Sequence, residues 1–201
     1  QLQQRVHRSG EVVAVEAEPH RGGPNAARAA ESSGTDSARR SGRTWDQIRA
    51  AVAAGWTALD LREADAVERA IAAHVGGAST VFHSSTPGGR SVSSDDVVAG
   101  LAEVGRARLS AAPRTRLVVC GGDTSGHLLR ALGVGALGIE SRPWGNVALC
   151  RAHAPGAAYD GTEMVLKGGQ MGHPDLFEDV RLGRATTTSA TSDPMETPAR
   201  C

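Results

Sequence analysis

Short apolar runs alternate with amphipathic stretches from Ser41 onward, and glycine-rich turns separate several of them. The runs predicted to be strands are Trp56–Leu61, Thr80–His83, Leu117–Cys120, Ala136–Glu140 and Met164–Lys167. The predicted helices run from Thr44, as N-cap, to Gly55, and over Ala64–Val75, Ser94–Leu109, Ser125–Leu132 and Asp175–Arg181. This alternation predicts an α/β domain with a mostly parallel sheet flanked by helices. Such sheets bind ligands beyond the carboxyl ends of their strands.

The 201 residues suit one domain with a tail at each end. Residues 1–40 are rich in Arg, Ser, Gly and Glu, and an irregular arm is expected there, with Val12–Val15 as its one strand candidate. The domain itself is expected over residues 41–184. Residues 185–201 are rich in Thr, Ser and Pro, and we expect them to form a flexible tail.

Charge and composition exclude several classes of protein. The 22 basic residues balance the 22 acidic ones, whereas nucleic-acid-binding domains normally carry a basic excess. No apolar stretch approaches the length of about 18 residues that a membrane span needs. The three cysteines are far apart and form no disulfide framework. A cytoplasmic protein is therefore expected, and the start at Gln1, without an initiating Met or a signal peptide, suggests a fragment of a longer chain.

The strongest local motif is Gly121–Gly126, directly after a predicted strand. Glycines let a ligand approach the backbone closely. Thr124 and Ser125 offer hydroxyls, and the start of the following helix favours anions, so the turn could cradle a phosphate. Asp123 could help such a site by holding Mg²⁺ through water, by accepting a hydrogen bond or by capping the helix. The alternative is a purely structural turn, because Gly-Gly-Asp and Asp-Thr-Ser are common turn sequences.

Two similar motifs are rejected. Gly121 and Gly126 have the spacing of a P-loop, but His127 stands where a P-loop requires Lys. The segment Gly133–Gly138 matches GxGxxG, yet it follows a predicted helix and leads into a strand, the reverse of the dinucleotide-binding order. A helix C-cap glycine with a tight turn explains that segment better.

A second glycine-rich motif, Lys167–Gly172, also follows a predicted strand. Lys167 is the only lysine of the chain, and an ammonium beside a glycine loop can contact a phosphate. Gln170 could hydrogen-bond a base, a ribose or a phosphate. The alternative is a turn with a surface lysine. Two such loops at strand ends make a shared ligand more probable than either loop does alone.

The remaining chemistry-bearing residues point to no other site. The seven histidines have no metal-ligand spacing, so no protein-bound metal cluster is expected. Cys120 is expected to be a buried packing residue. Ser125 lacks the GxSxG context of an acyl-transfer nucleophile, and no catalytic residue can be named from the sequence.

Four segments occur in a recognisable order and spacing: Gly121–Gly126, Leu129–Val134, Pro143-x-Gly145, and Leu166–Gly172 followed by Asp175-x-Phe177. Upstream of them lies Ser41-x-x-Thr44-x-x-Gln47-Ile48. Together they resemble the C-terminal nucleotide-binding domain of the four-carbon acid sugar kinases, over about residues 41–182. Members of this family act on 3-oxo-tetronate, erythronate or threonate.

The resemblance implies an ATP-dependent kinase that phosphorylates a four-carbon sugar acid at its terminal hydroxyl, with Mg²⁺ accompanying ATP. It places ATP on the C-terminal domain, at Ser41, at the turn of Gly121, Gly122, Asp123, Thr124 and Ser125, and at the loop of Lys167, Gly168 and Gly169. The sugar acid would bind an N-terminal domain. A homodimer is compatible with this family, and neither nucleic acid nor a membrane is expected as a partner.

The sequence departs from the family in two respects. The N-terminal sugar-binding domain has no counterpart in these residues, and Gly42 replaces the proline that follows the family's serine. The chain alone is therefore expected to lack the sugar site and the catalytic base, and to be inactive by itself. The alternative hypothesis is a non-catalytic or degenerate module that binds a nucleotide or another phosphometabolite.

Overall fold

The computed structural model describes residues 12–16, 34–63, 65–72, 79–84, 93–112 and 115–186, and it leaves out the side chains of residues 12–16, 34–41, 94 and 123. Seven strands form one sheet in the order β2-β3-β1-β4-β7-β6-β5. They are β1 (Val12–Glu16), β2 (Thr57–Asp60), β3 (Thr80–His83), β4 (Arg116–Cys120), β5 (Ala136–Trp144), β6 (Val147–His153) and β7 (Glu163–Lys167).

The sheet is parallel from β2 to β7 and antiparallel beyond it. Four strand pairs run parallel, whereas β6 pairs antiparallel with both β7 and β5. The mostly parallel α/β sheet predicted from the sequence is thus confirmed, with an antiparallel hairpin added at one edge.

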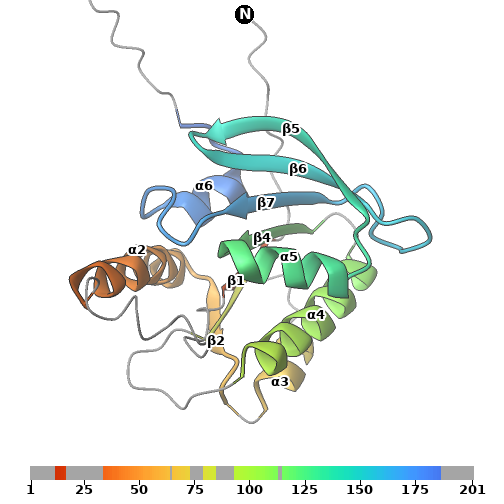
Figure 1. Cartoon of the computed structure of the whole chain (residues 1–201), viewed down its shortest axis with the longest axis horizontal. Coiled ribbons are helices and arrows are strands. Elements are labelled where there is room, and N and C mark those ends of the chain that lie inside the picture. Colours follow the sequence, from red (N-terminus) through yellow and green to blue (C-terminus); the bar gives the residue numbers. More distant parts are fainter. Residues whose placement is uncertain are drawn as a thin grey trace, which may run out of the picture.

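Helices cover both faces of the parallel part (Figure 1). They are α2 (Gly34–Ala53), α3 (Ala66–Ala72), α4 (Ser94–Ala111), α5 (Gly122–Ala131) and α6 (Leu176–Leu182). The five residues of β4 are all buried, because alternate side chains serve two cores. Leu117 and Val119 pack with α3, α4 and α5, whereas Val118 and Cys120 pack with α2 and α6.

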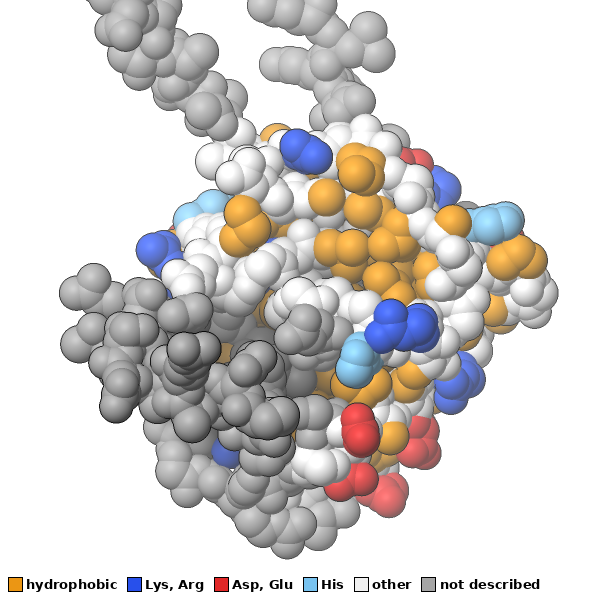
Figure 2. Space-filling model, viewed as in Figure 1, with side chains coloured by type: hydrophobic (Ala, Val, Ile, Leu, Met, Phe, Trp, Pro, Cys, Tyr) orange, Lys and Arg blue, Asp and Glu red, His pale blue; other side chains and the backbone are white. Residues whose placement is uncertain are grey.

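The antiparallel edge is less completely covered than the parallel part. Hydrophobic side chains gather over β5, β6 and β7, beside α5, in the face shown in Figure 2. Ile139 of β5 is 63% exposed, while Leu137 and Leu166 are partly buried against the core. The hairpin therefore extends the sheet beyond the helices.

Several boundaries differ from the sequence-based expectations. Helix α2 begins at Gly34, so Thr44 lies within it rather than capping it, and the last residues of the predicted arm over residues 1–40 belong to this helix. The strand candidate Val12–Val15 in that arm is confirmed as β1. Strand β1 lies between β3 and β4, so the sheet begins upstream of the expected domain boundary at Ser41. A polar, arginine-rich segment such as the start of α2 can be helical when the tertiary structure supplies partners for the helix, which a compositional argument does not include.

The predicted start of α4 at Ser94 is confirmed, and one other element departs from prediction. The residue that caps α4 is Ser93, whose hydroxyl accepts a hydrogen bond from the Asp96 amide at 3.1 Å. Strand β6 was not predicted, since Arg151 and His153 interrupt its apolar pattern. Its hairpin with β5 has a two-residue turn, Gly145-Asn146, which is a recognised hairpin signal.

The parallel pairing brings five strand ends to one edge of the sheet. Glu16, the last residue of β1, is in register with His83 of β3 and with Cys120 of β4. Cys120 is in turn in register with Lys167. Figure 1 shows α2, the start of α5 and the loop after β7 on this same side of the molecule. The carboxyl edge is therefore the place to look for a ligand site.

Candidate functional site

The turn after β4 is built almost entirely from backbone. Gly121 has a φ of 99°, a value that side chains rarely tolerate. Its N–H donates to the Lys167 carbonyl at 3.0 Å, and its carbonyl accepts from the Ser125 amide at 3.0 Å and from the Ser125 hydroxyl at 2.5 Å. Because Gly121 is the N-cap of α5 and has no side chain, it makes no side-chain cap bond. The start of α5 therefore receives no cap bond from Gly121 and carries the partial positive charge of a helix N-terminus.

The buried side chains of Lys167 and Thr44 hold the loop after β7 in place. Lys167 is 3% exposed, and its Nζ donates to the Gly168 carbonyl at 3.2 Å, the Gly169 carbonyl at 3.4 Å and Thr44 Oγ1 at 3.3 Å. The Thr44 hydroxyl donates to the Gly169 carbonyl at 2.6 Å. Helix α2 is therefore attached to the loop through a buried hydroxyl and a buried ammonium.

Gln47 makes a second attachment one helical turn further along α2. Its Nε2 donates to the carbonyls of Met171 and His173, at 3.0 Å each. Thr44 and Gln47 are the polar members of the buried stripe of α2, whose other members are Ile48 and Ala51. The helix thus presents hydrogen-bonding groups on the face that would ordinarily be purely apolar. The order of the loop depends on this face.

The fold requires glycine at some positions of the two turns and not at others. Gly172 has a φ of 84°, and an added Cβ would lie 2.5 Å from Leu176 Cδ2, so the fold itself requires glycine there. Gly122 and Gly169 have no left-handed φ, and an added Cβ would meet nothing within 4 Å at either position. The space above these two backbones is open, and the fold does not explain why neither residue carries a side chain.

Of the residues predicted to contact ATP, most lie together. Gly121, Gly122 and Thr124 belong to the first turn, and the hydrogen bond from Gly121 to Lys167 joins its base to that of the second turn, which holds Gly168 and Gly169. Thr124 is buried, and the Ser125 hydroxyl is bonded to the Gly121 carbonyl.

Ser41 and Asp123 lie in α2 and in the first turn of α5, and their side chains are outside the described part of the structure. Thr44 and Gln47, which hold the loop after β7, were not among the predicted site residues. The available signal was two polar residues at helical spacing within an otherwise apolar stripe.

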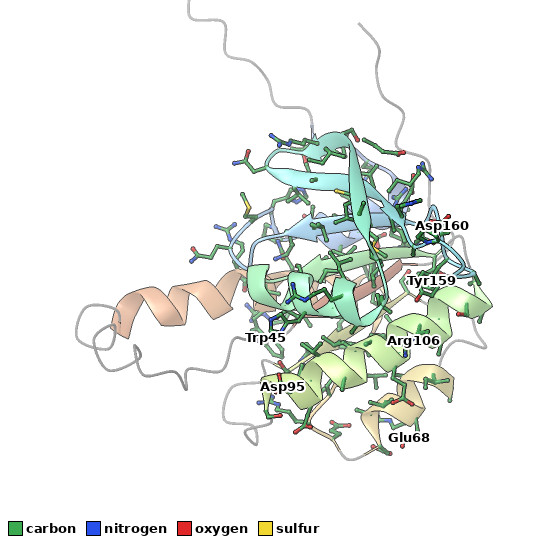
Figure 3. All side chains as sticks on the ribbon, turned by 45° about the vertical axis from the view of Figure 1, so that its right-hand side comes forward. Trp45, Glu68, Asp95, Arg106, Tyr159 and Asp160 are labelled. Carbon is green, nitrogen blue, oxygen red and sulfur yellow. The ribbon has the colours of Figure 1, made fainter. Side chains whose placement is uncertain are left out.

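A histidine and a tryptophan lie at the neighbouring strand end. The ring of His83 contacts Trp45 of α2 edge-on, with 5.6 Å between ring centroids. Trp45 is labelled in Figure 3, near the end of α2 that meets the sheet. His83 is 5% exposed, and burial lowers its pKa, an effect that the nearby Asp60 opposes in part. His83 is therefore neutral at pH 7.

The described residues contain neither a metal-binding cluster nor a membrane-spanning helix. No group of three or more His, Cys, Asp or Glu side chains is arranged to hold a metal ion in that part of the chain. None of the described helices combines the length and apolar character that crossing a membrane requires.

Comparisons with known proteins agree with this geometry. Residues 13–177 match the model of a family described as the nucleotide-binding C-terminal domain. A segment of 84 residues is 44% identical to a 3-oxo-isoapionate kinase of Paraburkholderia graminis, and it covers 42% of this chain and 18% of that kinase.

Two solved structures share the fold. One is a DUF1537 domain of Bordetella bronchiseptica with bound citrate, a domain-swapped dimer, with a TM-score of 0.60 and 22% identity over 90% of this chain and 43% of that one. The other is a Haemophilus influenzae protein of the DUF1537 family, with a TM-score of 0.60 and 16% identity over 87% of this chain and 40% of that one. The chain thus spans less than half the length of these relatives. It belongs to the family of nucleotide-binding C-terminal domains found in four-carbon acid sugar kinases.

Proposed function

We propose that this chain is the ATP-binding part of a kinase that phosphorylates a four-carbon sugar acid at its terminal hydroxyl. The observation that carries the proposal is the pair of open glycines, Gly122 and Gly169. Alanine would fit the fold at either position, and in the first turn of a helix it would be favoured over glycine. A ligand that approaches both backbones accounts for the absence of side chains.

The ligand that suits these turns is a polyphosphate. The start of α5, which Gly121 does not cap, carries partial positive charge, and the Gly169 and Gln170 amides of the second loop donate no backbone hydrogen bond within the described residues. Phosphoryl transfer needs positioning and charge neutralisation more than covalent help, which a backbone cradle supplies. Mg²⁺ would arrive bound to ATP and would neutralise part of the phosphate charge. Asp123 and Ser41 are proposed as further contacts, since they lie in α5 and in α2, one turn before Thr44.

The kinase activity itself requires more than this chain. We propose that the sugar acid binds a separate domain, corresponding to the part of the solved relatives that this chain does not cover. The relative from Paraburkholderia graminis acts on 3-oxo-isoapionate, which supports a sugar-acid substrate. The domain-swapped Bordetella structure is compatible with a homodimer, which light scattering of the purified chain would detect.

The test is calorimetric titration of Mg²⁺ and ATP into the wild-type chain and three glycine variants. Gly122→Ala and Gly169→Ala are expected to melt at or above the wild-type temperature and to lose most of their affinity for ATP. Gly126→Ala is the matched control in α5, because its Cβ would make only an ordinary contact, at 3.6 Å, with Arg130. ATP binding by all three variants at wild-type affinity would contradict the proposal.

A further inference from the structure

Among the described side chains, the ammonium of Lys167 has hydrogen-bond partners but no carboxylate partner. Its three N–H groups are matched by three acceptors: Thr44 Oγ1 and the carbonyls of Gly168 and Gly169. No carboxylate lies within ion-pairing distance of Nζ in the part of the chain that the structure describes. A buried cation without an opposite charge is costly, so its presence at a strand end calls for an explanation.

The hydrogen bonds of Lys167 also fix the direction of two peptide groups. In a trans peptide the C=O and the following N–H point in opposite directions. Because the carbonyls of Gly168 and Gly169 point toward Nζ, the N–H groups of Gly169 and Gln170 point away from it. Neither N–H donates a hydrogen bond within the described residues, and Gln170 is exposed. The N–H groups of Gly169 and Gln170 thus point away from the Lys167 ammonium, which lies on the carbonyl side of the same two peptide groups.

The shape of the loop does not depend on Lys167 alone. The Gly168 carbonyl also accepts from the Met171 amide at 3.0 Å, and the Gly169 carbonyl also accepts from the Thr44 hydroxyl at 2.6 Å. Removing the ammonium would therefore leave neither carbonyl without a donor. What would be lost is the charge.

We infer that Lys167 is a positioning residue whose buried charge acts through the Gly168–Gln170 loop and makes the site selective for the polyphosphate of its ligand. The inference rests on the proposed function, since it concerns the same cradle. Lys167 does not touch the phosphates in this arrangement. Its charge strengthens the outward amides as anion donors, and the bound anion supplies the counterion that the ammonium otherwise lacks.

The experiment compares Lys167→Met with the wild-type chain and with Arg130→Met, which removes an exposed cation from α5. The probes are ADP, inorganic pyrophosphate and adenosine. Lys167→Met is expected to weaken ADP and pyrophosphate binding by about 10- to 100-fold and to leave adenosine unchanged. Its ADP affinity is also expected to depend less steeply on salt. Without ligand, it is expected to melt at or above the wild-type temperature, because the substitution removes a buried charge that no described carboxylate pairs with.

The possible outcomes separate the two claims. Equal losses for ADP and adenosine would show that Lys167 only maintains the structure, and unchanged ADP affinity would show that its charge has no part in binding. Either result overturns the inference. A folded wild-type chain that binds none of the three probes would overturn the proposed function itself. Loss of pyrophosphate binding in Lys167→Met, with binding retained in Arg130→Met, supports both.

Discussion

The two turns at the carboxyl edge reach similar arrangements by different means. The turn after β4 is local, since its bonds join Gly121 to Ser125 and to the adjacent strand. The loop after β7 is held by Thr44 and Gln47, which are more than 120 residues away in the sequence. The first turn therefore depends on the backbone conformation of one glycine. The second depends on the docking of α2, so substitutions in it should lower the free energy of unfolding more than substitutions in the first turn do.

The largest effect is expected for Gly172→Ala, in the loop that α2 holds. Its Cβ would overlap Leu176 Cδ2 at 2.5 Å and press on Gln47 Nε2 at 3.1 Å, and the φ of 84° adds strain. The free energy of unfolding is expected to fall by about 2–4 kcal/mol, measured by urea denaturation. Gly161→Ala is the control, with a φ of 79° and open space around its Cβ, and is expected to lose about 1–2 kcal/mol. Equal losses would show that the packing against α2 is unimportant.

Gln47→Ala is expected to have the next largest effect. It removes both donors from the carbonyls of Met171 and His173, and Gln47 is completely buried. A loss of about 2 kcal/mol is expected, together with faster amide exchange in the loop after β7. Arg49→Ala, at an exposed position of the same helix, should change stability by less than about 0.5 kcal/mol. Unchanged exchange in the Gln47 variant would mean that α2 does not hold the loop.

Gly121→Ala tests the local turn. A residue with a side chain is strained at a φ of 99°, so a loss of about 1–2 kcal/mol is expected by thermal unfolding. ATP binding should also be lost, because the start of α5 would shift. Gly122→Ala, one residue later, should keep its full stability. If both variants were equally stable, the conformation of Gly121 would not be what defines this turn.

The same contrast explains what could be predicted from the sequence. The turn at Gly121 was placed correctly between a strand and a helix because its determinants are neighbours in the sequence. Thr44 was assigned to a helix cap, although its hydroxyl bonds the distant Gly169. Its spacing from Gln47 was visible, but their common partner is known only after β7 and α2 are brought together. The segment that resembles the kinase family includes both residues, but the resemblance does not indicate that they bind the loop after β7.

The smallest effect concerns acid stability, and it tests the other contact of α2 at this edge. Burial lowers the pKa of His83 in the folded protein, so the unfolded chain takes up a proton near the ordinary pKa of 6.5 and the folded protein does so only at lower pH. The free energy of unfolding is therefore expected to be constant above about pH 6.5 and to fall as the pH decreases below it.

The contribution of His83 can be separated from that of the acidic residues. Glu178 accepts hydrogen bonds from Arg181 and Trp56, and these lower its pKa from an ordinary value of 4.5. Glu178 therefore loses its contribution to the free energy of unfolding only in more acidic solution. Urea denaturation between pH 7 and 5.5 therefore separates His83 from Glu178, although other histidines, such as His153 beside Asp160 and His173 beside Asp179, titrate in the same window. The part of the slope that His83→Phe removes is the contribution of His83, whereas Glu178→Gln should leave the slope intact. A slope that is unchanged in His83→Phe would place the titrating group elsewhere. The contact between Trp45 and His83 would then be a packing contact that has no part in the acid sensitivity of this edge.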